Sequence, residues 1–208
     1  MAVMTFLARS ARWDYVWRAE RAGGRETAAA WYRARGSGGM RLRNVQAGDV
    51  AAYVAMRCDP EMTAGLGGPL PRDGIEAKVA SDVREAEADA AWIKMIVPDE
   101  AAPEVVAGSV VLWSHAAGGD PMSEIGWMVL PEFQGRGIGK TAVRILLELA
   151  RDADRWGLVH AFPATTNAAS NGICRSLGFK LAEERNVTFA GRVLRASHWI
   201  IDPHTDLT

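Results

Sequence analysis

The chain has 208 residues, a formal net charge of −1, 49% hydrophobic residues and 24% charged residues, a balance that suits one globular domain with a sizeable core. The near-neutral charge supplies no basic field of the kind that nucleic-acid-binding domains carry, so nucleic acid is not expected as a partner. No run of about 18 apolar residues could span a membrane, and the N-terminus lacks the apolar core of a secretory signal, so a soluble, cytoplasmic protein is expected.

The first 39 residues differ in composition from the rest of the chain. They hold seven arginines against three acidic residues, mixed with alanine and tryptophan, and they end at Gly36-Ser37-Gly38-Gly39. This pattern predicts one or two amphipathic helices, joined by a flexible link to a domain at residues 40–208. A membrane-surface or partner helix, a targeting peptide and a plain upstream extension stay open, because basic amphipathic stretches are weakly diagnostic.

From Met40 onward, periodicity and turn residues predict an alternation of strands and helices. The expected elements are a strand at 41–45, helices at 47–57 and 71–90, strands at 91–97, 105–115 and 124–130, a helix at 137–154, a strand at 159–163, a helix at 168–176, and strands at 180–189 and 192–201. The helix at 137–154 has the strongest pattern, with Ile138, Thr141, Ile145 and Leu149 on its apolar side.

A glycine-rich turn, Gln134-Gly135-Arg136-Gly137-Ile138-Gly139-Lys140, lies between a strand and this helix. Glycines permit positive φ and close approach to a ligand, and the first N–H groups of a helix attract anions, so the order of elements predicts a phosphate site. A P-loop requires glycine at Gln134 and a dinucleotide fingerprint requires glycine at Lys140, so neither motif fits. For this motif alone, a turn that merely caps the helix is the alternative.

Two motifs in this order resemble those of the GNAT acyltransferases, which bind acetyl-coenzyme A. The first is Gln-x-x-Gly-x-Gly at Gln134, Gly137 and Gly139, and the second is Asn167-Ala168-Ala169-Ser170 leading to Leu177-Gly178-Phe179. The resemblance covers residues 40–202 and implies an α/β fold with a mixed, centrally splayed sheet of six to seven strands and about four flanking helices, preceded by the N-terminal extension.

A narrower resemblance is to the ribosomal-protein N-terminal alanine acetyltransferase branch. It is carried by Glu124-Ile125-Gly126-Trp127 ahead of Pro131-Glu132, and by Asp59-Pro60-Glu61. The resemblance implies acetyl-CoA as co-substrate, and a homodimer is a reasonable guess from it. Backbone N–H groups of the turn would hold the pyrophosphate, with Gln134 fixing the start of the turn. The turn residues concerned are Gly135, Arg136, Gly137, Ile138, Gly139 and Lys140.

The resemblance also implies which residues bind the pantetheine arm of coenzyme A. Main-chain groups of Met128 and Val129 would pair with the arm as if it were an added strand, since diverging strands expose unpaired N–H and C=O groups. Asn167 would hydrogen-bond the arm and cap the following helix, or act as the cap only. Ser170 would contact pantetheine or face its own turn.

Direct acetyl transfer to an amine requires a base, an oxyanion donor and an acid for the leaving thiolate. Glu124 is the candidate base, acting directly or through water, with a solvated strand-end carboxylate as the alternative. The Val129 N–H is the candidate oxyanion donor. Many relatives have a tyrosine four residues before the Gly-Phe pair, where this chain has Cys174. Cys174 and Ser170 are both candidate acids, and Cys174 could equally be a core residue.

The leading interpretation is an acetyl-CoA-dependent N-acetyltransferase that acts on a primary amine, either a protein N-terminus or a small molecule. The missing tyrosine keeps a second interpretation open, a non-catalytic coenzyme A-binding regulatory or interaction module. The two cysteines and four histidines show no metal-ligand spacing, so no metal is expected. The identity of the acceptor amine cannot be decoded from one sequence, because it depends on variable loops.

Overall fold

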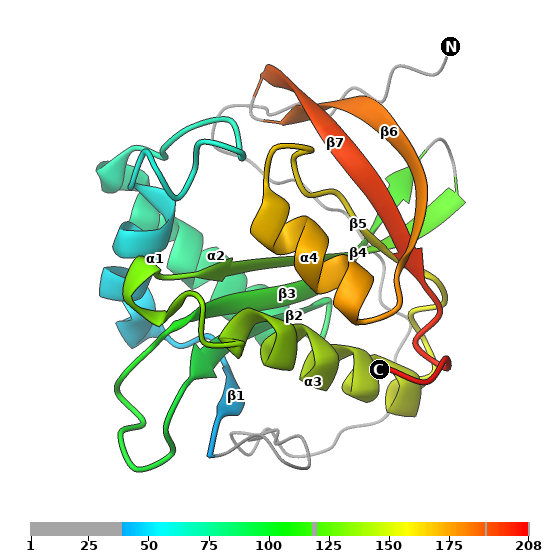
Figure 1. Cartoon of the computed structure of the whole chain (residues 1–208). Coiled ribbons are helices and arrows are strands. Elements are labelled where there is room, and N and C mark those ends of the chain that lie inside the picture. The colour runs from blue at the N-terminus through cyan, green and yellow to red at the C-terminus, as the bar shows by residue number, and fades with distance from the viewer. Residues whose placement is uncertain (1–38, 118–119, 190, 208) are drawn as a thin grey trace.

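The structure is a computed structural model, and it describes residues 39–117, 120–189 and 191–207. These residues form one mixed sheet with helices on both faces. Its seven strands run in the order β1-β2-β3-β4-β5-β7-β6 (Figure 1). The strands are β1 (Arg41–Asn44), β2 (Ala91–Val97), β3 (Gly108–Ala117), β4 (Asp120–Val129), β5 (Val159–Ala161), β6 (Lys180–Phe189) and β7 (Arg192–Ile201). The helices are α1 (Val50–Arg57), α2 (Ile75–Glu87), α3 (Ile138–Ala153) and α4 (Ala168–Ser176).

The predicted order of elements and the predicted fold class are confirmed, with differences at several boundaries. Short 3-10 turns at Ala47–Asp49 and Arg72–Gly74 precede α1 and α2, where continuous helices were expected. β3 starts three residues later than predicted, and β4 starts four residues earlier. The predicted extension at residues 1–39 lies outside the described residues except for Gly39.

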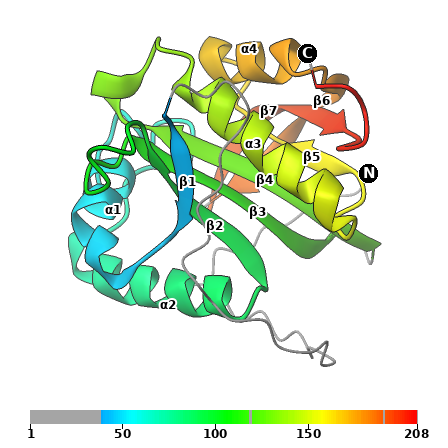
Figure 2. The same cartoon turned by 90° about the horizontal axis from the view of Figure 1, so that it is seen from below.

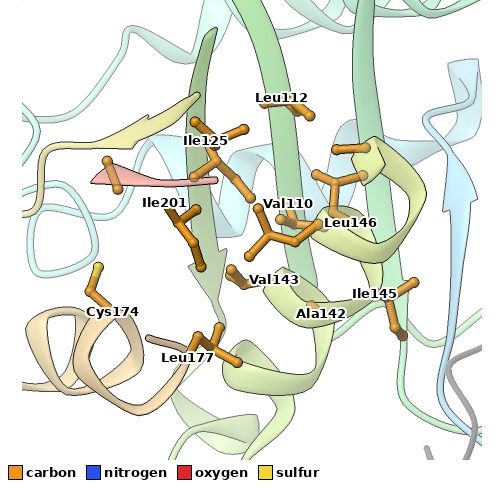
Figure 3. Close-up of a cluster of buried hydrophobic side chains, with 14 of the residues drawn as sticks. Val110, Leu112, Ile125, Ala142, Val143, Ile145, Leu146, Cys174, Leu177 and Ile201 are labelled. Carbon is orange, nitrogen blue, oxygen red and sulfur yellow. The ribbon is translucent and has the colours of Figure 1, made fainter. Parts of the chain in front are cut away.

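The helices cover the two faces of the sheet in pairs (Figure 2). On one face, α3 and α4 pack their apolar side chains against β3, β4 and β7, and Figure 3 shows Val143, Leu146 and Leu177 meeting Ile125 and Ile201. On the other face, α1 and α2 pack on β2 through Tyr53, Met56, Ile75 and Val79. Burial on both faces gives the sheet its stability, because apolar area removed from water contributes roughly 25 cal/mol per Å².

The buried side of α3 differs from the predicted one. Ile145 is buried as expected, but Ile138, Thr141 and Leu149 are only partly buried. The fully buried positions instead follow a wider stripe, namely Gly139, Ala142, Val143, Leu146, Leu147 and Ala150. The stripe is wide because α3 contacts the sheet and α4 together.

A buried hydrogen-bonded group joins α1 to α2. The Tyr53 hydroxyl donates to Asp82 Oδ2 at 2.7 Å, and Lys78 forms an ion pair with the other oxygen of the same carboxylate. Burial, followed by the charge of Asp82, raises the pKa of Tyr53 well above its usual range. The tyrosine therefore stays a hydrogen-bond donor, and its bond to Asp82 ties α1 to α2.

The centre of the sheet opens between β4 and β5. These strands are parallel, and their ladder has two register pairs, Ser123 with Val159 and Glu124 with His160. β5 ends at Ala161, whereas β4 continues to Val129. The stretch of β4 after Glu124 therefore has β3 on one side and an opening on the other, which is the splay that the sequence predicted.

None of the described helices is long and apolar enough to cross a membrane.

Candidate active site

The backbone of β4 determines which groups face the splay. Leu130 N–H donates to Ala107 O at 2.9 Å, next to the register pair Gly108 with Val129. Because main-chain groups alternate in direction along an antiparallel strand, Met128 bonds toward β3 while Trp127 and Val129 direct their N–H and C=O groups into the splay. The predicted pairing of pantetheine with main-chain groups of Met128 is therefore wrong. Trp127, which was not predicted, presents its main-chain groups in its place.

Gly108 supports this orientation directly. A Cβ built on Gly108 would lie 2.0 Å from the Met128 carbonyl oxygen, so this carbonyl points at β3. The side chain of Met128 is buried in the core on the α1 and α2 face. Val129, by contrast, keeps the position that the sequence assigned to it, at the end of the open edge.

The glycine-rich turn ends at the N-terminus of α3. Gly135 and Gly137 have φ of +70° and +75°, and a Cβ on either residue would meet no atom within 4 Å. Thr141 N–H donates to Gly137 O at 3.0 Å, so the N–H groups of Ile138, Gly139 and Lys140 precede the first intrahelical bond. A 16-residue helix thus presents its first N–H groups and the positive end of its dipole beside a turn whose glycines have no neighbouring atom within 4 Å of a Cβ. This arrangement fits a diphosphate.

Gln134 ties the turn to the splayed strand. Its Nε2 donates to Val129 O at 2.8 Å and lies 4.0 Å from Met62 Sδ. The Val129 carbonyl is therefore bonded by Gln134, and Val129 has its N–H left for a ligand. Arg136 is exposed, and its guanidinium lies 5.8 Å from the centre of the Phe133 ring. The geometry of the anion site is thus carried by main-chain groups.

Asn167 caps α4, as the sequence predicted for one of its two roles. Its Oδ1 accepts from Ser170 N–H at 2.9 Å, which leaves its Nδ2 as a donor for a ligand. Ser170 is half-buried in the first turn of α4. Ile173 of the same helix lies against the start of α3, since its Cδ1 would be 3.1 Å from a Cβ on Gly139. Asn167 and Ser170 therefore belong to the segment that borders the turn.

Asn171 is a residue that the sequence reasoning missed. It is buried and makes three side-chain bonds, donating to Ala164 O and Asn167 O and accepting from Trp199 Nε1, at 2.9, 2.8 and 2.8 Å. These bonds join the β5–α4 loop, α4 and β7. Its position one turn after the helix cap was the available signal, because a buried Asn inside a helix needs backbone partners.

Glu124 lies at the last register pair before β4 and β5 separate. Its side chain is 16% exposed, and Oε2 is 3.0 Å from His115 Nε2, whose side chain is 5% exposed. His115 is a second residue that the sequence reasoning missed, since its strand gave no hint that it faces Glu124. The pair shows that Glu124 is held in place and half-buried, unlike a solvated strand-end carboxylate.

Cys174 is a core residue, and its predicted role as the acid is corrected. It is 0% exposed and packs with Leu177 and the side chains of α3 (Figure 3). Burial raises the pKa of its thiol to about 12. A side chain with no accessible surface cannot reach a departing sulfur, so Ser170 is the remaining candidate in α4.

The loop at 58–71 lies close to three segments that are distant in the sequence. Met62 approaches Gln134 at the anion turn. A Cβ on Gly65 would lie 3.6 Å from Ala164 Cβ, and one on Gly68 would lie 3.5 Å from an Arg192 guanidinium nitrogen. The loop thus lies close to the turn, the β5–α4 loop and the start of β7. Within the described residues, no group of three His, Cys, Asp or Glu side chains could hold a metal ion.

The comparison with protein families identifies this architecture. Residues 40–180 match the family model described as the acetyltransferase (GNAT) domain. The match covers more than half of the chain, so the chain belongs to the GNAT acetyltransferase family. The predicted family is confirmed, and with it the fold. No curated protein matches the chain by sequence.

Solved structures share the fold at low sequence identity. A GNAT-family acetyltransferase from Bacillus anthracis has a TM-score of 0.70 at 13% identity, covering 85% of this chain and 100% of its own. The ribosomal-protein-S5-alanine acetyltransferase from Vibrio fischeri has a TM-score of 0.65 at 15% identity, covering 80% and 94%. A putative acetyltransferase from Salmonella typhimurium, solved with its cofactor acetyl-CoA, has a TM-score of 0.62 at 21% identity, covering 81% and 96%.

Proposed function

We propose that the protein is an N-acetyltransferase that moves an acetyl group from acetyl-CoA directly to a primary amine, either a protein N-terminus or a small molecule. The observation that carries the proposal is the splay beside the anion turn. The N–H groups of Ile138, Gly139 and Lys140 precede the first intrahelical bond of α3, and the adjacent edge of β4 is open. A diphosphate with a long amide-bearing arm matches both features.

Each remaining residue has a defined part in the reaction. Asn167 Nδ2 and the main-chain groups of Trp127 orient the arm, and the Val129 N–H donates to the oxygen that becomes negative in the transition state. Glu124 removes a proton from the attacking amine, directly or through water, and Ser170 donates one to the leaving sulfur. Acetyl-CoA supplies the activated acetyl group. The ribosomal-protein acetyltransferases among the structural neighbours favour protein N-termini as the first acceptors to test.

Titration calorimetry with acetyl-CoA and a thiol-release assay together test the proposal. The acceptors are peptides with N-terminal alanine or serine, spermidine and an aminoglycoside. Glu124→Gln should lower kcat by about 100-fold while the affinity for acetyl-CoA stays within about twofold, because the base acts after binding. Glu104→Gln, at an exposed glutamate in the β2–β3 loop, is the matched control and should behave as the wild type.

A second variant tests the binding of acetyl-CoA by itself. Gly137→Ala should weaken acetyl-CoA binding by about 10-fold, because an L-residue at φ +75° is strained by roughly 1–2 kcal/mol and shifts the turn. Tight binding with no thiol release for any acceptor would instead support the non-catalytic coenzyme A-binding module. Absence of binding would reject both functions.

A further inference from the structure

Titratable side chains form a row across the sheet at the closed end of the splay. His115 on β3 contacts Glu124 on β4, and His160 on β5 contacts His198 on β7, with His160 Nδ1 and His198 Nε2 2.8 Å apart. Glu124 and His160 are register partners on neighbouring strands, so their side chains share one face of the sheet. The catalytic base proposed above therefore has His160 as its register neighbour on β5.

The far end of this row is a carboxylate. His198 Nδ1 is buried without a hydrogen-bond partner, and it lies 3.9 Å from Glu183 Oε1 on β6. Arg185, also on β6, lies over the Phe162 ring at 5.0 Å, and that ring stacks on His198 at 4.5 Å. The groups around the histidine pair are thus His115, Glu124, Glu183 and Arg185.

The position of Glu183 selects one tautomer of the pair. The 2.8 Å contact needs a single proton between the two rings. If His198 Nε2 carried this proton, the lone pair of His198 Nδ1 would face the Glu183 carboxylate. If His160 Nδ1 carries the shared proton, His198 is protonated on Nδ1 instead, and that proton faces the Glu183 carboxylate, which is electrostatically favourable. The second arrangement leaves His160 Nε2 unprotonated and basic.

Both rings are neutral near pH 7. Burial, followed by the positive charge of Arg185, lowers the pKa of His160, and the same two causes lower the pKa of His198 to about 4. A neutral His160 with an unprotonated Nε2 can accept a proton. It is therefore suited to take over a proton that Glu124 has accepted.

We propose that His160 is a second proton acceptor of the reaction, which takes from Glu124 the proton that the amine loses. As the amine nitrogen bonds to the acetyl carbon and the carbon–sulfur bond breaks, an N–H proton moves to the Glu124 carboxylate and then to His160 Nε2, which releases it to water. His198 and Glu183 are positioning residues that keep His160 in the basic tautomer. This inference rests on the proposed acetyltransferase function.

The pH dependence of kcat/KM tests the relay. The probe is the N-terminal alanine peptide, and kcat/KM is expressed against the concentration of neutral amine so that titration of the acceptor drops out. In the wild type, kcat/KM should fall as the pH drops through the pKa of His160, which lies below 6.5. His160→Gln should remove this acid limb and lower kcat/KM at pH 7.5 by about 10-fold.

His204→Gln is the matched control, because His204 is exposed and contacts Asp154 on the far side of the domain. Its profile should follow that of the wild type. An unchanged acid limb in His160→Gln would overturn the proposal.

Nitrogen-15 NMR of the histidine rings in the full chain gives a readout without turnover. At pH 7.5, His160 Nε2 should be unprotonated and His198 Nδ1 protonated. Glu183→Gln should replace this single tautomer with a mixture, because the carboxylate that selects it is gone. The reverse tautomer in the wild type would contradict the proposal. Calorimetry with acetyl-CoA tests the proposed function separately, so a failure of the proton relay can be distinguished from a failure of the proposed function.

Discussion

At the scale of single residues, environment decides which chemistry a side chain can offer. Glu124 and Cys174 were both candidates for proton transfer. The structure places Glu124 at the edge of the splay against His115, and it places Cys174 in the core between α4 and α3. One residue remains available for chemistry while the other contributes packing.

The burial of Cys174 predicts selective labelling. In the native protein, an aromatic disulfide reagent should react with Cys58, which is partly exposed, and should leave Cys174 unmodified until the protein unfolds. The pKa of about 12 further suppresses the thiolate that such a reagent needs. The measurement is the number of thiols released before and after denaturant. Cys58→Ala should remove the fast phase, and fast labelling that persists in that variant would show that Cys174 is accessible.

The buried amide of Asn171 predicts a stability defect. Asn171→Ala should lower the free energy of unfolding by about 2–3 kcal/mol, because Trp199 Nε1 and Ala164 O lose their partner inside the protein. Denaturant unfolding measures the change. Asn186→Ala, at an exposed position of β6, is the control and should change stability by less than about 0.5 kcal/mol. An equal loss in both variants would refute the role of the buried bonds.

At the scale of elements, sequence patterns differ from the structure mainly in where a strand begins and in which side of a helix is buried. β3 was expected to begin at residue 105, but it begins at Gly108, directly opposite Val129. Likewise, the apolar period of α3 predicted a helix correctly but misplaced its buried side, since only Ile145 of the four predicted residues is buried. Periodicity reports that a face is buried, and neighbouring elements decide its width.

The close approach of β3 to β4 at Gly108 predicts that a side chain is not tolerated there. Gly108→Ala should destabilise the protein by about 3 kcal/mol, because its Cβ would be 2.0 Å from the Met128 carbonyl and a backbone atom cannot move aside. The midpoint of thermal unfolding checks this. Gly48→Ala is matched, since a Cβ there meets no atom within 4 Å, and its midpoint should stay near that of the wild type. A tolerated alanine at 108 would mean that the ladder is looser than described.

At the scale of the whole molecule, the buried histidines couple stability to pH. The pKa of His198 is about 4 in the folded protein and about 6.5 in the unfolded chain. The unfolded state therefore binds a proton first as the pH falls. This stabilising contribution is complete above pH 6.5 and is lost progressively down to about pH 4, by about 3 kcal/mol.

The variant His198→Gln checks this coupling. Its free energy of unfolding should change less than that of the wild type between pH 6.5 and pH 4, by up to about 3 kcal/mol. Denaturant titrations at several pH values measure it, and His204→Gln should keep the slope of the wild type. Parallel curves for His198→Gln and the wild type would contradict the assignment.

The order of elements, the anion turn and the family were all readable from the sequence. Local features encode them: glycines at 135 and 137 that permit positive φ, an Asn that caps α4, and apolar periods of two and 3.6 residues. Such signals act over a few neighbouring residues, so the chain carries them without reference to the rest of the fold.

The tertiary structure alone decided which groups meet across strands. Strand register joins His115 to Glu124 across the β3–β4 hairpin, and it joins His160 to His198, 38 residues further along the chain. A single sequence does not show this register. The same register turned the Met128 main chain toward β3 and made Trp127 its replacement, because backbone direction alternates from the first bonded pair. Local chemistry thus specified the glycine-rich turn at the start of α3, and strand pairing specified which titratable side chains meet at the closed end of the splay.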